Sequence, residues 1–391
     1  NEKVETMNHR KRHIINGSVF LVASAVTWAA VTSAAEPPPA TSLAESVKPA
    51  SYGVALRSNV RVAMRDGVEL STYICLPTAP GEKFPVILLR TPYGKGTPFR
   101  SDASKKLASR GYVIVVQYCR GRGESDGEWE PMVNEMADGL DMHEWLLAQP
   151  WCNGTIGTNG GSYGGYTQWV SAPGAGDYLQ EMFAKVPLFD WYQDCVYIGG
   201  AFSLEKMMMW GVGNSVRPKG TDVPKPDWDK AFRQLPLSTW DKAIGYEVPF
   251  LRDWIARPQF DEYWAKSSIR GRWNEITCPT VTVSGWYDVF LKQALDHVAA
   301  VKTLSASKQV RRHQYLIIGP WPHYFGLRGD VDFGPQASIN TAALQVNLCD
   351  GIIRARYRES ATKPTLIKPG EVYRYEIDLW ATSNVFLPGH R

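Results

Sequence analysis

The chain has 391 residues, a formal net charge of +4 and 44% hydrophobic residues. This length suggests one large α/β domain with additions, or roughly two to three domains, and the hydrophobic content is ordinary for a globular protein. The near balance of charge gives no indication of nucleic-acid binding.

The N-terminal residues 1–35 have the three parts of an export signal. Basic residues at 10–12 precede an apolar run over 19–31, and Ser33-Ala34-Ala35 fits a cleavage site. We expect a periplasmic or secreted protein without a stable membrane span after cleavage. An uncleaved membrane anchor is the alternative, for which the apolar run is short. Residues 36–52 are predicted to be a flexible lead-in.

From about residue 53, apolar runs alternate with helical patterns. The expected strands lie at 60–64, 70–75, 85–90, 112–117, 155–157, 181–186, 280–284 and 314–318. The expected helices lie at 104–110, 131–148 and 166–172. The first two strands form a hairpin through Arg65-Asp66-Gly67, and the alternation after them implies a parallel sheet. The sequence therefore predicts an α/β fold with antiparallel strands at one edge.

Residues 190–277 differ from this pattern, because they are rich in Trp, Tyr and Met and contain no buried strand. We expect them to form a helical cap inserted between two parts of the sheet domain, 53–189 and 278–345. Such caps cover an active site and shape its pocket; ordinary surface helices are the alternative. Residues 346–391 carry alternating strand patterns, too few for an independent domain.

The segment Gly160-Gly161-Ser162-Tyr163-Gly164 fits G-x-S-x-G, the nucleophile elbow of α/β-hydrolases. A serine at a sharp strand-to-helix turn sits in strained backbone, and neighbouring side chains would clash. A short strand precedes the motif and a helical pattern follows it. We therefore expect Ser162 to be a nucleophile.

In this fold the acid and the histidine follow the serine in the chain, each after a strand. Asp288 and His323 lie just past the two late strands, in that order. Asp190 and Asp194 compete for the acid role but are expected in the pocket wall. The other histidines after the signal fall on helices, before a strand or in the terminal segment: His143, His297, His313 and His390.

The oxyanion hole of such an enzyme needs two hydrogen-bond donors. One is expected to be the backbone N–H of Tyr163, the residue after the nucleophile. The second should come from the loop at 91–96, where the Tyr93 hydroxyl can donate. A tyrosine packed on the surface of a turn is the alternative for Tyr93.

Five motifs together resemble the S15 peptidase / CocE–NonD hydrolase family, over about residues 54–391. They are TPYGKG (91–96), RGRGESDGEW (120–129), GGSYGGYTQW (160–169), GWYDVF (285–290) and GPWPH (319–323). The resemblance implies an α/β-hydrolase fold with a helical cap and a C-terminal β jelly-roll. It also implies a Ser162, Asp288 and His323 triad with an oxyanion hole of Tyr93 and Tyr163.

The family includes cocaine esterase, α-amino-acid ester hydrolases and Xaa-Pro dipeptidyl-peptidases. The expected activity is therefore hydrolysis of ester or amide bonds in a small molecule, with release of Xaa-Pro dipeptides or an inactive, binding-only protein as alternatives. The pocket is expected to include Asp190, Trp191, Asp194, Trp286 and Trp321. No cofactor or metal is expected, since no His/Cys cluster is present; a homo-oligomer is possible.

The sequence departs from the family pattern in three places. Tyr118 stands where family members usually carry Asp. Only Asp194, with Asp190, falls near the carboxylates that hold the substrate ammonium in amino-ester hydrolases. Residues 346–391 resemble the middle of the jelly-roll, so we expect an incomplete sheet with exposed edges, prone to aggregation. Six cysteines make disulfides possible after export, but their spacing selects no pairing.

Overall fold

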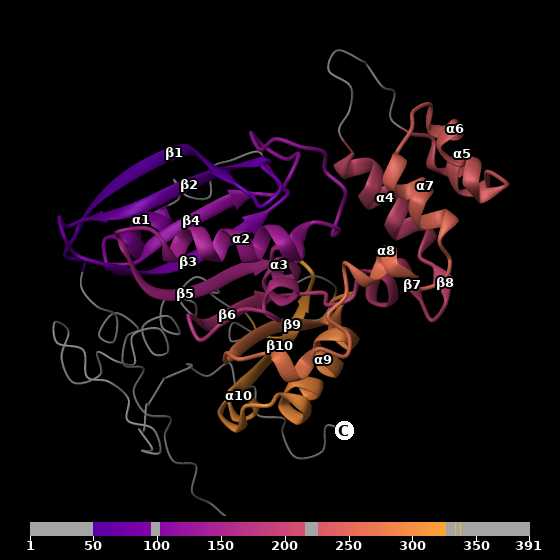
Figure 1. The fold of residues 1–391 in the computed structure, drawn as a ribbon. Coiled ribbons are helices and arrows are strands. Elements are labelled where there is room, and N and C mark those ends of the chain that lie inside the picture. Colours follow the sequence, from indigo (N-terminus) through magenta and orange to yellow (C-terminus); the bar gives the residue numbers. More distant parts are fainter. Residues whose placement is uncertain (1–49, 95–101, 216–225, 326–332, 334–336, 338–391) are drawn as a thin grey trace, which may run out of the picture. The chain divides into compact units, whose positions relative to one another are not determined.

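The computed structural model describes residues 50–94, 102–215, 226–325, 333 and 337. Its centre is an eight-stranded sheet in the order β1-β2-β4-β3-β5-β6-β9-β10 (Figure 1). The strands are β1 (Gly53–Ala63), β2 (Glu69–Thr78), β3 (Phe84–Thr91), β4 (Val113–Tyr118), β5 (Cys152–Gly161), β6 (Leu179–Lys185), β9 (Thr280–Tyr287) and β10 (Gln314–Pro322).

The hairpin strands β1 and β2 are antiparallel, and β2 joins β4 antiparallel, whereas β4, β3, β5, β6, β9 and β10 run parallel. This is the α/β-hydrolase sheet that the sequence predicts. β3 and β4 are nearly continuous apolar runs because both of their faces are covered by protein. Their carboxyl ends meet at one edge of the sheet, where ligands bind in open α/β folds.

Helices cover both faces of the sheet. They are α1 (Asp102–Ala108), α2 (Glu135–Leu147), α3 (Tyr163–Ser171), α9 (Leu291–Leu304) and α10 (Lys308–Arg312). Alternate residues of a strand point to opposite faces, so Leu88 and Val115 join the large core with Trp169 of α3, while Ile87 and Ile114 join a smaller core with α1. The site described below therefore rests on the larger core.

Two helix boundaries differ from the sequence prediction for local reasons. The helix expected at 131–148 begins at Glu135, because Met132 has φ = 71°, a left-handed conformation outside the helical region. The helix expected at 166–172 begins at Tyr163, immediately after the turn at Ser162. Hydrophobic periodicity cannot detect such backbone turns.

The expected cap, residues 190–277, is mainly helical in its described parts, 190–215 and 226–277 (Figure 1). It contains η2 (Tyr192–Val196), β7 (Tyr197–Ile198), β8 (Ala201–Phe202), α4 (Leu204–Asn214), α5 (Trp228–Arg233), η3 (Leu237–Thr239), α6 (Asp241–Ile244), α7 (Pro249–Ala256), α8 (Glu262–Ala265) and η4 (Trp273–Glu275). Trp240, Trp254 and Trp264 are fully buried in it. Many of the tryptophans thus form the cap's own core.

Some expectations lie outside the described residues: the signal at 1–35, nearly all of the lead-in and the jelly-roll segment at 346–391. In the described part of the chain, no helix has the length and apolar character needed to cross a membrane. The five cysteines of this part are buried and unpaired: Cys75, Cys119, Cys152, Cys195 and Cys278.

Glu181 of β6 is a buried carboxyl whose two oxygens have no hydrogen-bond partner among the described residues. Burial raises its pKa from 4.5 to about 8. Below pH 4.5 the Glu181 carboxyl is mostly protonated, and therefore neutral, in both the folded and the unfolded chain. As the pH rises towards 8, the unfolded chain releases this proton first, so the free energy of unfolding falls.

We therefore predict that Glu181→Gln becomes more stable relative to wild type between pH 5 and pH 8, by on the order of 3 kcal/mol. Urea unfolding at both pH values measures the difference. Glu144→Gln, an exposed site on α2, is the control and should show no such pH dependence. A Glu181→Gln effect that is equal at pH 5 and pH 8 would contradict the prediction.

Candidate active site

Ser162 sits in a strained turn between β5 and α3. Its φ is 55° and its ψ is −117°, a conformation that L-residues rarely adopt. A Cβ on Gly160 would lie 2.4 Å from the carbonyl oxygen of Gly164, so the turn requires glycine there. The Ser162 N–H donates to the Lys185 carbonyl at 2.9 Å, which fixes the turn to β6.

Three side chains from separate parts of the chain meet at this turn. His323 Nε2 lies 3.0 Å from Ser162 Oγ, and His323 Nδ1 lies 2.8 Å from Asp288 Oδ2. Asp288 follows β9 and His323 follows β10, at the carboxyl ends of adjacent parallel strands. The structure thus brings together the three residues that the sequence predicted, in hydrogen-bonding order.

The carboxylate of Asp288 is held in place by its surroundings. Its side chain is fully buried, and the Phe290 N–H donates to its second oxygen at 2.6 Å. A buried carboxylate next to Nδ1 favours the tautomer that carries the proton on Nδ1. Nε2 of His323 then has a free lone pair directed at the Ser162 hydroxyl.

Two groups beside Ser162 can donate hydrogen bonds to a developing oxyanion. Tyr163 is the first residue of α3, so its backbone N–H has no intrahelical acceptor. Burial raises the pKa of the Tyr93 phenol, which the nearby Trp210 indole and Ser162 hydroxyl partly offset. Both expected oxyanion residues are therefore next to the nucleophile.

A buried ion pair lies behind the elbow. The Tyr163 hydroxyl donates to Glu135 Oε1 at 2.7 Å, and Arg90 Nη1 lies 3.0 Å from Glu135 Oε2. Arg90 also donates to the Glu135 carbonyl at 2.8 Å. The side chains of Arg90 and Glu135 are only 2% exposed. This network joins the end of β3, the start of α2 and the residue after the nucleophile.

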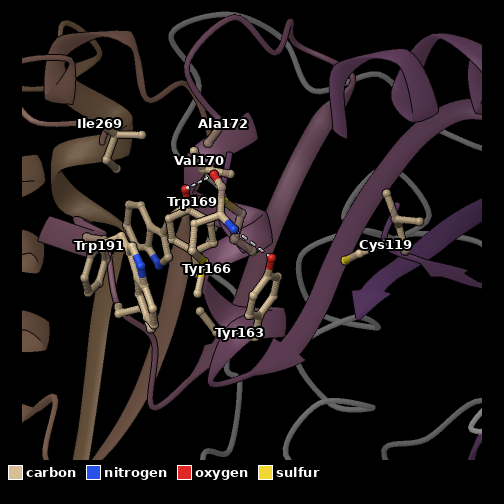
Figure 2. Close-up of a cluster of buried hydrophobic side chains, with 14 of the residues drawn as sticks. Cys119, Tyr163, Tyr166, Trp169, Val170, Ala172, Trp191 and Ile269 are labelled. Carbon is tan, nitrogen blue, oxygen red and sulfur yellow. Dashed lines mark hydrogen bonds between the residues drawn. The ribbon is translucent and has the colours of Figure 1, made fainter. Parts of the chain in front are cut away.

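Aromatic side chains connect the elbow to the cap. Tyr163, Tyr166 and Trp169 of α3 belong to the same buried cluster as Trp191 (Figure 2). The Tyr166 hydroxyl donates to the carbonyl of Ser267 in the cap at 3.1 Å. These contacts position the cap against the helix that begins at the nucleophile.

Trp210 of α4 is a site residue that the sequence analysis missed. Its Nε1 lies 3.5 Å from the Tyr93 hydroxyl, and its ring stacks near Tyr163 with a centroid distance of 6.5 Å. It also contacts Trp191 at 5.2 Å. The only signal for it in the sequence was the abundance of tryptophan in the cap.

Arg122, within the RGRGESDGEW motif, connects the loop of Tyr93 with the cap. Its Nε donates to the Pro92 carbonyl at 2.8 Å, and its Nη1 donates to the Asn214 carbonyl, at the end of α4, also at 2.8 Å. Its guanidinium lies 4.3 Å above the ring of Trp129. One side chain therefore holds the loop of Tyr93 and the cap helix α4 together.

The two acids expected in the pocket wall have protein partners. Asp190 accepts a hydrogen bond from Ser268 at 2.5 Å and pairs with Arg270 at 3.4 Å. Asp194 lies 3.0 Å from His297 Nε2 and also accepts from two backbone N–H groups. Both carboxylates are buried. These contacts hold the segment from Asp190 to Asp194, where the chain passes from the sheet into the cap.

The three expected pocket tryptophans lie in different surroundings. Trp191 is buried against Trp210, while Trp286 at the end of β9 is 45% exposed. Trp321 is 3% exposed and packs with Phe183 in a core cluster. A Cβ on Gly285 would lie 1.8 Å from the Trp321 carbonyl oxygen. Strands β9 and β10 therefore approach closely near their carboxyl ends.

Tyr118, which departs from the family pattern, is accommodated by glycines. Its ring would lie 2.6 Å from a Cβ on Gly123 and 3.3 Å from one on Gly94. Gly94 directly follows Tyr93. The Tyr118 ring therefore packs closely against the loop that carries Tyr93.

Sheet order, nucleophile turn and hydrogen-bonded side chains together define an α/β-hydrolase. A family model described as X-Pro dipeptidyl-peptidase (S15 family) matches residues 66–325, and one for the C-terminal non-catalytic domain of that peptidase matches residues 301–391. The first match covers well over half of the chain. The chain therefore belongs to the S15 peptidase family, which is a family of hydrolases.

Comparison with individual proteins agrees with this assignment. Cocaine esterase from Rhodococcus sp. (strain MB1 Bresler) is 26% identical over 87% of this chain and 90% of its own length. An aminopeptidase from a marine sediment Thaumarchaeota archaeon has a similar fold (TM-score 0.60, 21% identity, 78% of this chain and 55% of that one). So does an α-amino acid ester hydrolase (TM-score 0.59, 21% identity, 87% and 59%). The chain spans little more than half of these two structures.

We predict that Glu135→Gln destabilises the fold, because it leaves the buried Arg90 without its main counter-ion. Asp138, at 3.8 Å from Arg90 Nη2, is shared with Arg120 and compensates only part of this charge. Breaking a buried ion pair costs about 3–5 kcal/mol. Urea unfolding should therefore show a loss on the order of 3 kcal/mol, while the exposed Glu144→Gln on the same helix changes little. Equal stability of the two variants would disprove the role of Glu135.

Proposed function

We propose that this chain is a serine hydrolase that cleaves ester or amide bonds through an acyl-enzyme intermediate. The observation that carries the proposal is the hydrogen-bonded sequence Asp288–His323–Ser162, with distances of 2.8 and 3.0 Å. Its position at the carboxyl ends of the strands and the membership of the S15 family support the same reading.

In the proposed reaction, Ser162 Oγ attacks the carbonyl carbon of the substrate while His323 Nε2 accepts the hydroxyl proton. Asp288 stabilises the imidazolium that forms. The tetrahedral intermediate collapses, the bond to the leaving group breaks, and the leaving alcohol or amine takes the proton from Nε2. Water then repeats the sequence on the acyl-enzyme, with His323 as its base, and regenerates Ser162.

The oxyanion of the intermediate would accept hydrogen bonds from the Tyr163 N–H and the Tyr93 hydroxyl. The raised pKa of Tyr93 keeps this phenol protonated at neutral pH, so that it can donate. A donor of this kind contributes about 10²–10³-fold to turnover.

The proposed substrates are small esters or amides, by analogy with the cocaine esterase and the α-amino acid ester hydrolase named above. The description of the matching family model favours a second candidate, release of Xaa-Pro dipeptides. We also propose export by the segment at 1–35. An inactive, binding-only protein is the third alternative, and the labelling experiment below tests it.

We predict that Ser162→Ala abolishes hydrolysis of phenyl acetate and labelling by a fluorophosphonate probe, because both need the Oγ nucleophile. Steady-state release of phenol measures the hydrolysis, and in-gel fluorescence measures the labelling. A folded wild-type protein that never takes the label would favour the binding-only alternative. Comparing alanyl-prolyl-nitroanilide with phenyl acetate on the wild-type protein separates the peptidase from the esterase.

We further predict that Tyr93→Phe lowers kcat for phenyl acetate by about 10²-fold while KM changes little, because the hydroxyl acts mainly on the charge of the transition state. The variant should still react with the fluorophosphonate, only more slowly. An unchanged kcat would exclude Tyr93 from the oxyanion hole.

A further inference from the structure

Lys206 of the cap helix α4 presents a buried ammonium close to the proposed triad. Its Nζ is excluded from solvent, its polar neighbour is the Cys195 thiol, and no charged group pairs with it within the part of the chain that the structure describes. It lies 4.6 Å above the ring of Phe290. Phe290 in turn contacts the His323 ring, with a centroid distance of 5.4 Å. The ammonium is therefore separated from the proposed base by one aromatic ring.

The geometry of α4 directs Lys206 to the same side as Trp210. Residues four apart lie on one face of a helix, one turn from each other. Trp210 reaches the Tyr93 hydroxyl at 3.5 Å, while Lys206 reaches Phe290 beside His323. A single face of the cap helix thus supplies one aromatic and one cationic side chain to the two sides of Ser162.

None of the anionic groups near Lys206 serves as its counter-ion. Burial raises the pKa of the adjacent Cys195 thiol to about 12, even though Lys206 lowers it, so the thiol is neutral at physiological pH. Asp194, next to Cys195, is occupied by His297 and two backbone N–H groups. No ion pair joins Lys206 to any described carboxylate.

A buried ammonium without a counter-ion costs free energy, which a bound anion would recover through charge-assisted hydrogen bonds. We propose that Lys206 binds a carboxylate of the substrate, so that the enzyme prefers anionic esters or amides. This inference rests on the proposed serine hydrolase function and deepens it. The inference argues against a requirement for an ammonium group on the substrate. The two carboxylates that could bind one are already paired, Asp190 with Arg270 and Asp194 with His297.

The test uses two pairs of esters, each consisting of an anion and its neutral methyl ester. One pair carries the carboxylate on the acyl group (4-nitrophenyl hemiglutarate), and the other carries it on the leaving group (4-acetoxybenzoate). For wild type, kcat/KM should favour the anion by about tenfold or more in at least one pair, the effect of one charge-assisted hydrogen bond.

Lys206→Met should remove this preference without a comparable loss on the neutral ester of the same pair. Lys206→Arg keeps the positive charge and should retain a preference. Lys230→Met is the matched control, because it removes an exposed charge from helix α5 of the same cap. It should leave the preference unchanged.

Three results would overturn the proposal. One is a wild-type enzyme that turns over both members of each pair equally, which would leave the serine hydrolase function intact. The second is a Lys206→Met variant that loses the same factor on anionic and neutral esters, as a purely structural contact with Phe290 would. The third is a wild-type protein that neither hydrolyses an ester nor takes the fluorophosphonate label, which would remove the proposed function as well. Only wild type is needed for the first and third, so they hold even if Lys206→Met fails to fold.

Discussion

The carboxylate of Glu135 is the constraint on which the rest of the site depends. It is buried, and it joins Arg90 at the end of β3 to the hydroxyl of Tyr163 directly after the nucleophile. Because neither charge can reach water, each requires the other at a fixed position. These contacts hold the end of β3, which leads into the loop of Tyr93, at a fixed distance from the turn at Ser162.

Much of the fold and the centre of the site could be predicted from the sequence because both depend on local signals. Asp288 and His323 each follow a strand with an apolar pattern, and Ser162 follows a strand that ends in the glycines of a recognisable motif. The parallel arrangement then brings their side chains to one edge, so chain order and strand ends sufficed to bring the three together.

The remaining features depend on contacts between segments far apart in the chain, which no local pattern records. Asp194 looked like a pocket acid, but its partner His297 lies 103 positions away on α9. Trp210 and Lys206 lie on a helix whose orientation follows from aromatic packing inside the cap, not from its own periodicity. The left-handed backbone of Met132, before the start of α2, is likewise not recorded by any hydrophobic pattern.

The two hydrogen bonds of Arg122 couple the loop that carries Tyr93 to the cap helix α4. The guanidinium holds Pro92, next to Tyr93, and Asn214, at the end of the helix that carries Lys206 and Trp210. A substitution that shifts this helix to fit a different substrate also moves the loop beside the nucleophile. Any change that displaces one of the two segments is therefore expected to disturb the other, because a single guanidinium is bonded to both.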